Sequence, residues 1–174
     1  SRARQTAAIV WSRLRNKIQD SILQQANDSL QNIEDVVPPL ELRAELRERF
    51  FGDLEGTSNA NYDRVWEFDA MSNISESSSS GGLFHSQFGV ESLSSVATRT
   101  QQLINELESK YNNAIIVLVS HGDTLQIMQA QCFSKSDESQ TFESKQTSSI
   151  LVKDCVRKHR SLPHLNTCEL RQLN

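Results

Sequence analysis

The alternation of apolar and polar residues predicts helices separated by short strands. Over residues 6–25, apolar side chains recur every three to four positions, which is the spacing of one helix face. Residues 91–111 repeat this spacing, and Ser92 is placed to cap the first turn. A shorter helix is predicted over residues 61–71, where aromatic and branched side chains are available for packing.

The run Ala114-Ile115-Ile116-Val117-Leu118-Val119 has a different pattern. All six residues are apolar and four are β-branched, which is typical of a strand buried on both faces. A helical pattern follows directly, opened by Gly122 and two good capping residues, Asp123 and Thr124. A strand that ends in this way leaves His121 at the carboxyl edge of a sheet, beside the free N–H groups of a new helix.

Two more strands are predicted, at residues 150–152 and 165–173. We therefore expect an α/β fold, a three-layer sandwich with a mostly parallel sheet and helices on both faces. Residues 1–174 read as a single domain. The Ser- and Gly-rich residues 73–89 and the polar residues 134–149 are predicted to be flexible insertions.

Composition narrows the function classes. The net charge of -4 gives no sign of a nucleic-acid or membrane surface, and no apolar stretch is long enough to cross a bilayer. The three cysteines lie far apart and match no zinc spacing, so no metal site is expected. An odd number of scattered cysteines suits a reducing compartment and predicts a cytoplasmic protein, although a targeting segment upstream stays open.

Four segments carry residues suited to chemistry, and each also has an ordinary structural explanation. Arg2, at a helix start, could hold a phosphate or be a solvated surface charge. Glu48, among arginines and aromatic rings, could have its protonation tuned for acid–base work or form a common ion pair. Glu91 could simply favour the start of a helix, and His121 could be a surface or capping residue.

The order of these segments resembles the histidine phosphatase superfamily, the phosphoglycerate mutase-like proteins. The resemblance covers nearly the whole chain, and four motifs in the right order make it specific. It rests on Arg2-Ala3-Arg4-Gln5-Thr6-Ala7, on the segment from Glu48 to Gly56, on Glu91-Ser92 with Arg99, and on Ser120-His121-Gly122.

The resemblance implies a role for each matching residue. Arg2 would hold the phosphoryl group, and Arg49 could assist substrate binding, as in some branches of the family. Glu48 would protonate the leaving oxygen and later activate water, while His121 would stabilise the charge that builds on the phosphoryl oxygens. The implied partner is a small phosphorylated substrate, with no metal and no cofactor, and a homodimer stays open.

The sequence departs from the family at one point. The family's nucleophile is a histidine in an Arg-His-Gly motif after the first strand, and this sequence contains no such motif. His85, His159 and His164 are all predicted to lie on the surface. We therefore expect the chain to be N-terminally truncated, with the first strand missing. As given, it is expected to be inactive and to fold poorly.

For the intact protein, the expected activity is hydrolysis of a small-molecule phosphomonoester through a phosphohistidine intermediate. A phosphoglycerate mutase-type phosphotransferase is a close alternative, but the nearly uncharged insertion at residues 73–89 favours hydrolysis. A non-catalytic protein of the same fold that binds a phosphorylated ligand is the rival from another class.

Overall fold

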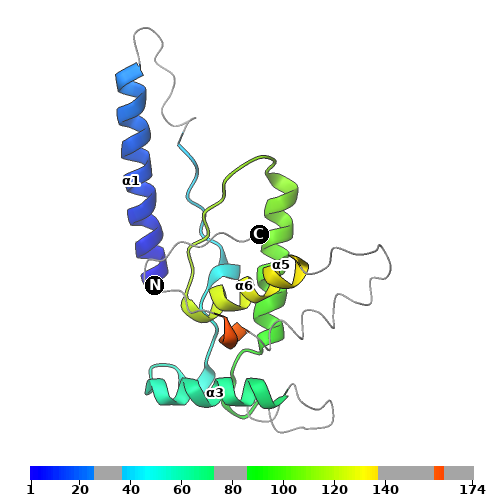
Figure 1. Cartoon of the computed structure of the whole chain (residues 1–174). Helices are drawn as coiled ribbons and strands as arrows, with labels where there is room; N and C mark the ends of the chain where they lie inside the picture. The colour runs from blue at the N-terminus through cyan, green and yellow to red at the C-terminus, as the bar shows by residue number, and fades with distance from the viewer. Residues whose placement is uncertain (26–36, 73–85, 137–158, 163–174) are drawn as a thin grey trace, which may run out of the picture.

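The computed structural model describes residues 1–25, 37–72, 86–136 and 159–162, and the regular structure in these ranges is helical. Two helices, α5 and α6, cross near the centre, while α1 stands to one side and α3 lies at one end (Figure 1). The elements are α1 (Arg2–Gln25), η1 (Ala44–Leu46), η2 (Gly52–Leu54), α3 (Asn59–Ser72), α5 (Leu93–Lys110), α6 (Gly122–Ser136) and η3 (His159–Ser161).

The predicted helices are confirmed, and their ends follow local rules. Helix α5 begins where the Ser92 hydroxyl accepts a hydrogen bond from the Ser95 amide at 3.2 Å. It ends where the Tyr111 amide bonds back to the Leu107 carbonyl. Helices α1 and α3 each begin a few residues before the predicted start.

The predicted α/β sandwich is wrong for the described part of the chain, which contains no strand and no sheet. The apolar run at residues 114–119 is irregular, and Ile115 within it is 97% exposed. A strand needs a neighbour to satisfy its backbone N–H and C=O groups, and no described segment pairs with this run. The predicted strands at 150–152 and 165–173 lie outside the described residues, as do most of the two predicted insertions.

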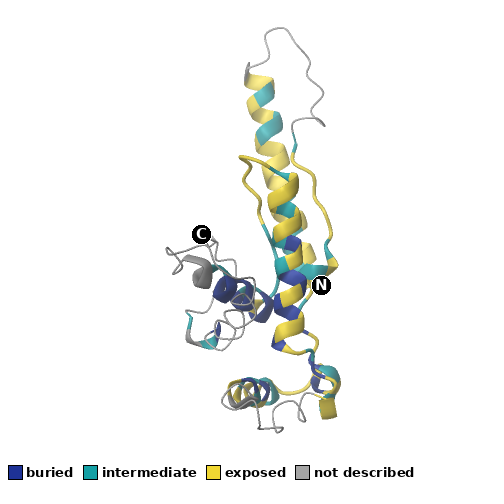
Figure 2. Ribbon diagram, turned by 90° about the vertical axis from the view of Figure 1, so that its right-hand side faces the viewer, coloured by how far each residue is buried: buried dark blue, intermediate teal, exposed yellow. Residues whose placement is uncertain are grey.

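Among the described residues, the core contains two small apolar clusters. In one, Leu93, Val96 and Ala97 of α5 pack against Ile127 of α6. In the other, the segment around η2 packs against α3 and against Val90, through Phe51, Leu54 and Val65. Burial is concentrated in α6 and in the neighbouring half of α5, whereas α1 is largely exposed (Figure 2).

Polar contacts strengthen the crossing of α5 and α6. The Gln131 side chain in α6 is buried and donates a hydrogen bond to the Ala97 carbonyl at 2.8 Å. Thr100 of α5 shares a second hydrogen bond with the Gln131 amide oxygen at 3.0 Å. These bonds hold α6 in one orientation, with its first turn directed at residues 46–49.

Among the described helices, none is long and apolar enough to cross a membrane.

Candidate active site

The site forms where the segment after η1 meets the start of α6. The Ser120 hydroxyl donates a hydrogen bond to the Leu46 carbonyl at 2.7 Å. Two residues into α6, the Thr124 hydroxyl lies 3.0 Å from the Arg47 carbonyl. These bonds join segments more than 70 positions apart, and they bring Glu48 next to His121.

The two predicted catalytic side chains face each other in this structure. Nδ1 of His121 lies 3.7 Å from Oε2 of Glu48, which is within ion-pair range and beyond hydrogen-bond range. Their side chains are 18% and 36% exposed, respectively. Both groups are therefore partly sheltered yet open to a ligand.

Glu48 has an environment suited to holding a proton. Burial raises the pKa of its carboxyl group, and the negative charge of Asp123 raises it further. Hydrogen bonds from the amide of Arg49 and from Thr124 oppose this rise without cancelling it. The acid form of Glu48 therefore persists to a higher pH than that of an ordinary glutamate.

The surroundings of His121 favour loss of its proton. Burial lowers the pKa of its imidazole, and the positive charge of Arg2 lowers it further. The neutral form is therefore favoured when the site is empty. A bound phosphate dianion would reverse this balance, because it adds negative charge next to the ring.

Arg2 comes to the same place from the start of α1. Its residue is exposed, and its charge acts on His121. The N-terminal end of α1 lies beside the turn that leads into α6 (Figure 1). The structure thus brings together two of the four predicted site residues, Glu48 and His121, with Arg2 close enough for its charge to act on His121.

Arg49, the fourth predicted residue, is buried instead of open to a ligand. Its side chain has no exposed surface and forms a two-pronged ion pair with Asp69 at 2.7 and 2.9 Å. The guanidinium also reaches Asp123 at 3.4 Å and the Glu91 carbonyl at 2.7 Å. Arg49 is therefore engaged inside the molecule and offers no surface to a ligand in this structure.

A comparison with known protein families then gives the context of this site. The model of the Histidine phosphatase superfamily (branch 1) matches residues 1–167. The chain belongs to this superfamily. Membership supports phosphatase- or mutase-type activity in general. None of the curated proteins and none of the solved structures gives a significant match.

The Glu91 side chain accepts several hydrogen bonds that connect α5 with the segment around Glu48. Its carboxylate accepts from Arg47 and Arg99 at 3.0 Å each, from the Ser95 hydroxyl at 3.0 Å and from the Phe50 amide at 3.2 Å. Burial alone would raise the pKa of Glu91, but the bonds from Arg99 and from the Phe50 amide lower it. The ionised carboxylate ties α5 to the segment that carries Glu48.

The prediction for His159 is wrong, because this residue is only 2% exposed. Its Nε2 lies 3.6 Å from Oδ1 of Asp123, in the same buried cluster as Arg49. Next to it, the Arg160 guanidinium stacks on the Trp66 ring at 3.5 Å from the ring centre. The sequence around His159 has no buried-strand pattern to signal this, and His85 and His164 lie outside the described residues.

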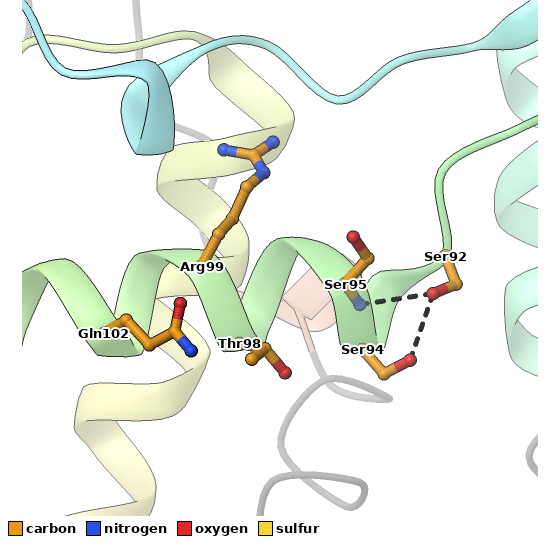
Figure 3. Close-up of a pocket in the computed structure, with 6 residues that line it drawn as sticks. All are labelled: Ser92, Ser94, Ser95, Thr98, Arg99 and Gln102. Atoms are coloured by element: carbon orange, nitrogen blue, oxygen red, sulfur yellow. Dashed lines mark hydrogen bonds between the residues drawn. The ribbon is translucent and has the colours of Figure 1, made fainter.

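A separate pocket of about 400 Å³ lies on the first turns of α5. Figure 3 shows its lining, which is made of hydroxyl and amide side chains and one guanidinium: Ser92, Ser94, Ser95, Thr98, Arg99 and Gln102. The Ser92 hydroxyl is engaged with the Ser95 amide and, at 3.0 Å, with the Ser94 hydroxyl. None of Arg2, Glu48 and His121 lines this pocket.

Two residues at the site were not predicted as functional. Asp69 lies in the last turn of α3 and belongs to none of the four motifs, so no signal in the sequence could have found it. Thr124 is recognisable as a capping residue, but its hydroxyl lies 3.3 Å from Oε1 of Glu48. That contact exists only because the two segments meet in the fold.

Proposed function

We propose that the site transfers the phosphoryl group of a small-molecule phosphomonoester to water through a phosphohistidine intermediate. The observation that carries the proposal is the pair formed by Glu48 and His121, which face each other at 3.7 Å beside the charge of Arg2. Phosphoryl transfer requires mainly positioned positive or hydrogen-bonding groups and one group that moves a proton. These three side chains supply both requirements.

In the first step, a nucleophilic histidine attacks phosphorus, and the bond between phosphorus and the ester oxygen breaks. Glu48 gives its proton to the departing oxygen, which leaves as an alcohol. In the second step, the Glu48 carboxylate takes a proton from water while the water oxygen attacks phosphorus. The phosphorus–nitrogen bond breaks, inorganic phosphate leaves, and Glu48 is protonated again.

Arg2 and His121 act on the phosphoryl group in both steps. The guanidinium presents donors in a planar fork that matches two phosphoryl oxygens. His121 donates a hydrogen bond as charge builds on those oxygens. Arg49 holds the Glu48 segment in place, because its enclosed guanidinium is committed to Asp69 and the Glu91 carbonyl.

The nucleophile itself is not assigned within residues 1–174, because the sequence contains no Arg-His-Gly. We propose that a histidine encoded upstream supplies it. The reading frame before Ser1 separates the candidate functions. A strand ending in Arg-His-Gly supports catalysis, whereas a frame without that histidine favours a protein that only binds phosphorylated ligands.

Phosphate binding can be tested on the present chain with inorganic phosphate as the probe, by following backbone amide resonances in an NMR titration. We expect His121→Ala and Arg2→Ala each to weaken binding by about tenfold or more, since each removes a donor to the anion. Arg13→Ala is the matched control, because it removes an exposed arginine from the same helix α1. Binding that survives the His121 substitution would contradict the site.

Turnover can be tested in a protein that includes the upstream histidine. There, His121→Ala is expected to lower the rate on a generic phosphomonoester by about 10²–10³-fold. Glu48→Gln is expected to slow hydrolysis mainly for esters with poor leaving groups, which need the proton most. Equal slowing of good and poor leaving groups would argue against the acid role of Glu48.

A further inference from the structure

The two oxygens of the Glu48 carboxylate have different surroundings. Oε1 accepts a hydrogen bond from the Arg49 amide at 3.0 Å and lies 3.3 Å from the Thr124 hydroxyl. Oε2 instead faces His121, 3.7 Å from Nδ1. One oxygen is thus held by the protein, while the other is directed toward the position proposed for substrate.

Thr124 is well fixed for this contact. It has no exposed surface, and it lies in the first turn of α6, whose orientation is held by the crossing with α5. A β-branched side chain has few rotamers available in a helix. Its hydroxyl has two acceptors in reach, the Glu48 carboxylate and the Arg47 carbonyl at 3.0 Å.

We propose that Thr124 is a positioning residue that directs the transferable proton of Glu48 to Oε2. In the ionised state, Oε1 is occupied by the Arg49 amide and the Thr124 hydroxyl, so an arriving proton binds Oε2, the oxygen that faces His121. The catalytic meaning of this arrangement rests on the proposed function, but the contact itself does not.

The hydroxyl can serve both protonation states of Glu48. When the carboxyl is ionised, Thr124 donates its proton to Oε1, and this bond favours the charged form. When the carboxyl is protonated, the hydroxyl turns its proton to the Arg47 carbonyl and Oε1 keeps the Arg49 amide. No proton is gained or lost by Thr124 in this exchange.

The other charged groups near Glu48 also influence the protonation of its carboxyl group or of its neighbour His121. Asp123, from α6, favours the protonated carboxyl. His121 faces Oε2 and is favoured in its neutral form by burial and by the charge of Arg2. The Arg49 guanidinium is turned to Asp69, so only its backbone amide meets the carboxylate. Among the described residues, Thr124 therefore supplies the side-chain hydrogen bond to Oε1, and its backbone amide likewise favours the ionised carboxylate.

The test is a carbon-13 NMR titration of the Glu48 side-chain carboxyl in the full chain, with the resonance assigned by its loss in Glu48→Gln. In Thr124→Val, the midpoint is expected to move to higher pH, with the acid dissociation constant falling by about threefold or more. Thr124→Ser keeps the hydroxyl and is expected to restore the wild-type midpoint. Thr124→Ala replaces the valine variant if the latter does not fold.

Ser120→Ala is the matched structural control. It removes a side-chain bond between the same two segments, the one to the Leu46 carbonyl at 2.7 Å, but no contact with Glu48. It is expected to lower the unfolding temperature and leave the Glu48 midpoint in place. An unmoved midpoint in Thr124→Val, or an equal shift in Ser120→Ala, overturns the proposal.

The titration tests the role of Thr124, and its outcome does not depend on whether the proposed phosphatase function is correct. The midpoint of Glu48 is measured without substrate and without turnover, so loss of the phosphatase hypothesis would leave it unchanged. Conversely, phosphate binding that depends on His121 would stand even if Thr124 proved to be without influence on Glu48.

Discussion

At the scale of single residues, two glycines in the Glu48–Gly56 segment make different demands on the chain. Gly52 and Gly56 both have positive φ angles, 58° and 71°, which side chains disfavour. A Cβ atom at Gly52 would also lie 1.8 Å from the Phe88 carbonyl oxygen, whereas one at Gly56 would meet nothing within 4 Å. Of these two glycines, Gly52 is therefore the one that permits a close approach of its backbone to that of Phe88.

Substitution of the two glycines by alanine is expected to lower stability by different amounts. Gly56→Ala is expected to lower the free energy of unfolding by about 1 kcal/mol, the usual penalty of the left-handed region. Gly52→Ala adds a backbone clash and is expected to lower it by more than about 2 kcal/mol. Urea unfolding of both variants measures the difference, and equal losses would show that the approach of Phe88 is unimportant.

At the scale of elements, a buried ion cluster joins three parts of the chain. Arg49 follows η1, Asp69 lies in α3 and Asp123 in the first turn of α6, and all three side chains are nearly or fully buried. Buried charges of this kind are stable only while their partners are present. The cluster thus holds α3 and α6 in fixed positions against the segment that carries Glu48.

Arg49→Ala is expected to lower the free energy of unfolding by about 3–5 kcal/mol, because it leaves two buried carboxylates without their cation. Arg43→Ala is the matched control. Its ion pair with Glu106 joins the segment before η1 to α5, but Glu106 is 48% exposed, so a far smaller change is expected. Thermal or urea unfolding compares the two, and a similar effect of both would show that the cluster does not brace the site.

At the scale of the whole molecule, α1 is attached less firmly than α5 and α6. Several of its apolar residues are exposed, including Ile9 and Leu23 at 61% each, and the Trp11 ring nitrogen donates a hydrogen bond to the Pro38 carbonyl at 2.8 Å. Regions with little buried apolar area open most readily. The Arg2 end of this helix nonetheless forms part of the site.

Hydrogen exchange should reveal this difference. Backbone amides in α1 are expected to exchange at least about tenfold faster than those in the crossing halves of α5 and α6. Mass spectrometry of peptides from each helix measures the rates within one sample, so no variant is needed. Equal protection in all three helices would mean that α1 is docked as firmly as the core.

The sequence determined the helices and the family. Periodicity and the cap at Ser92 predict α1, α3 and α5 because helical hydrogen bonds are local and need no distant partner. The order of the motifs likewise predicts Arg2, Glu48 and His121 as site residues.

Tertiary structure alone decided the rest. The run at residues 114–119 has the composition of a buried strand, but a strand depends on a neighbour that the described chain does not provide. The burial of Arg49 and His159, and the contact of Thr124 with Glu48, depend on partners 20 or more positions away. Local sequence patterns do not reveal such partners, because residues this far apart in the sequence come into contact only when the chain folds.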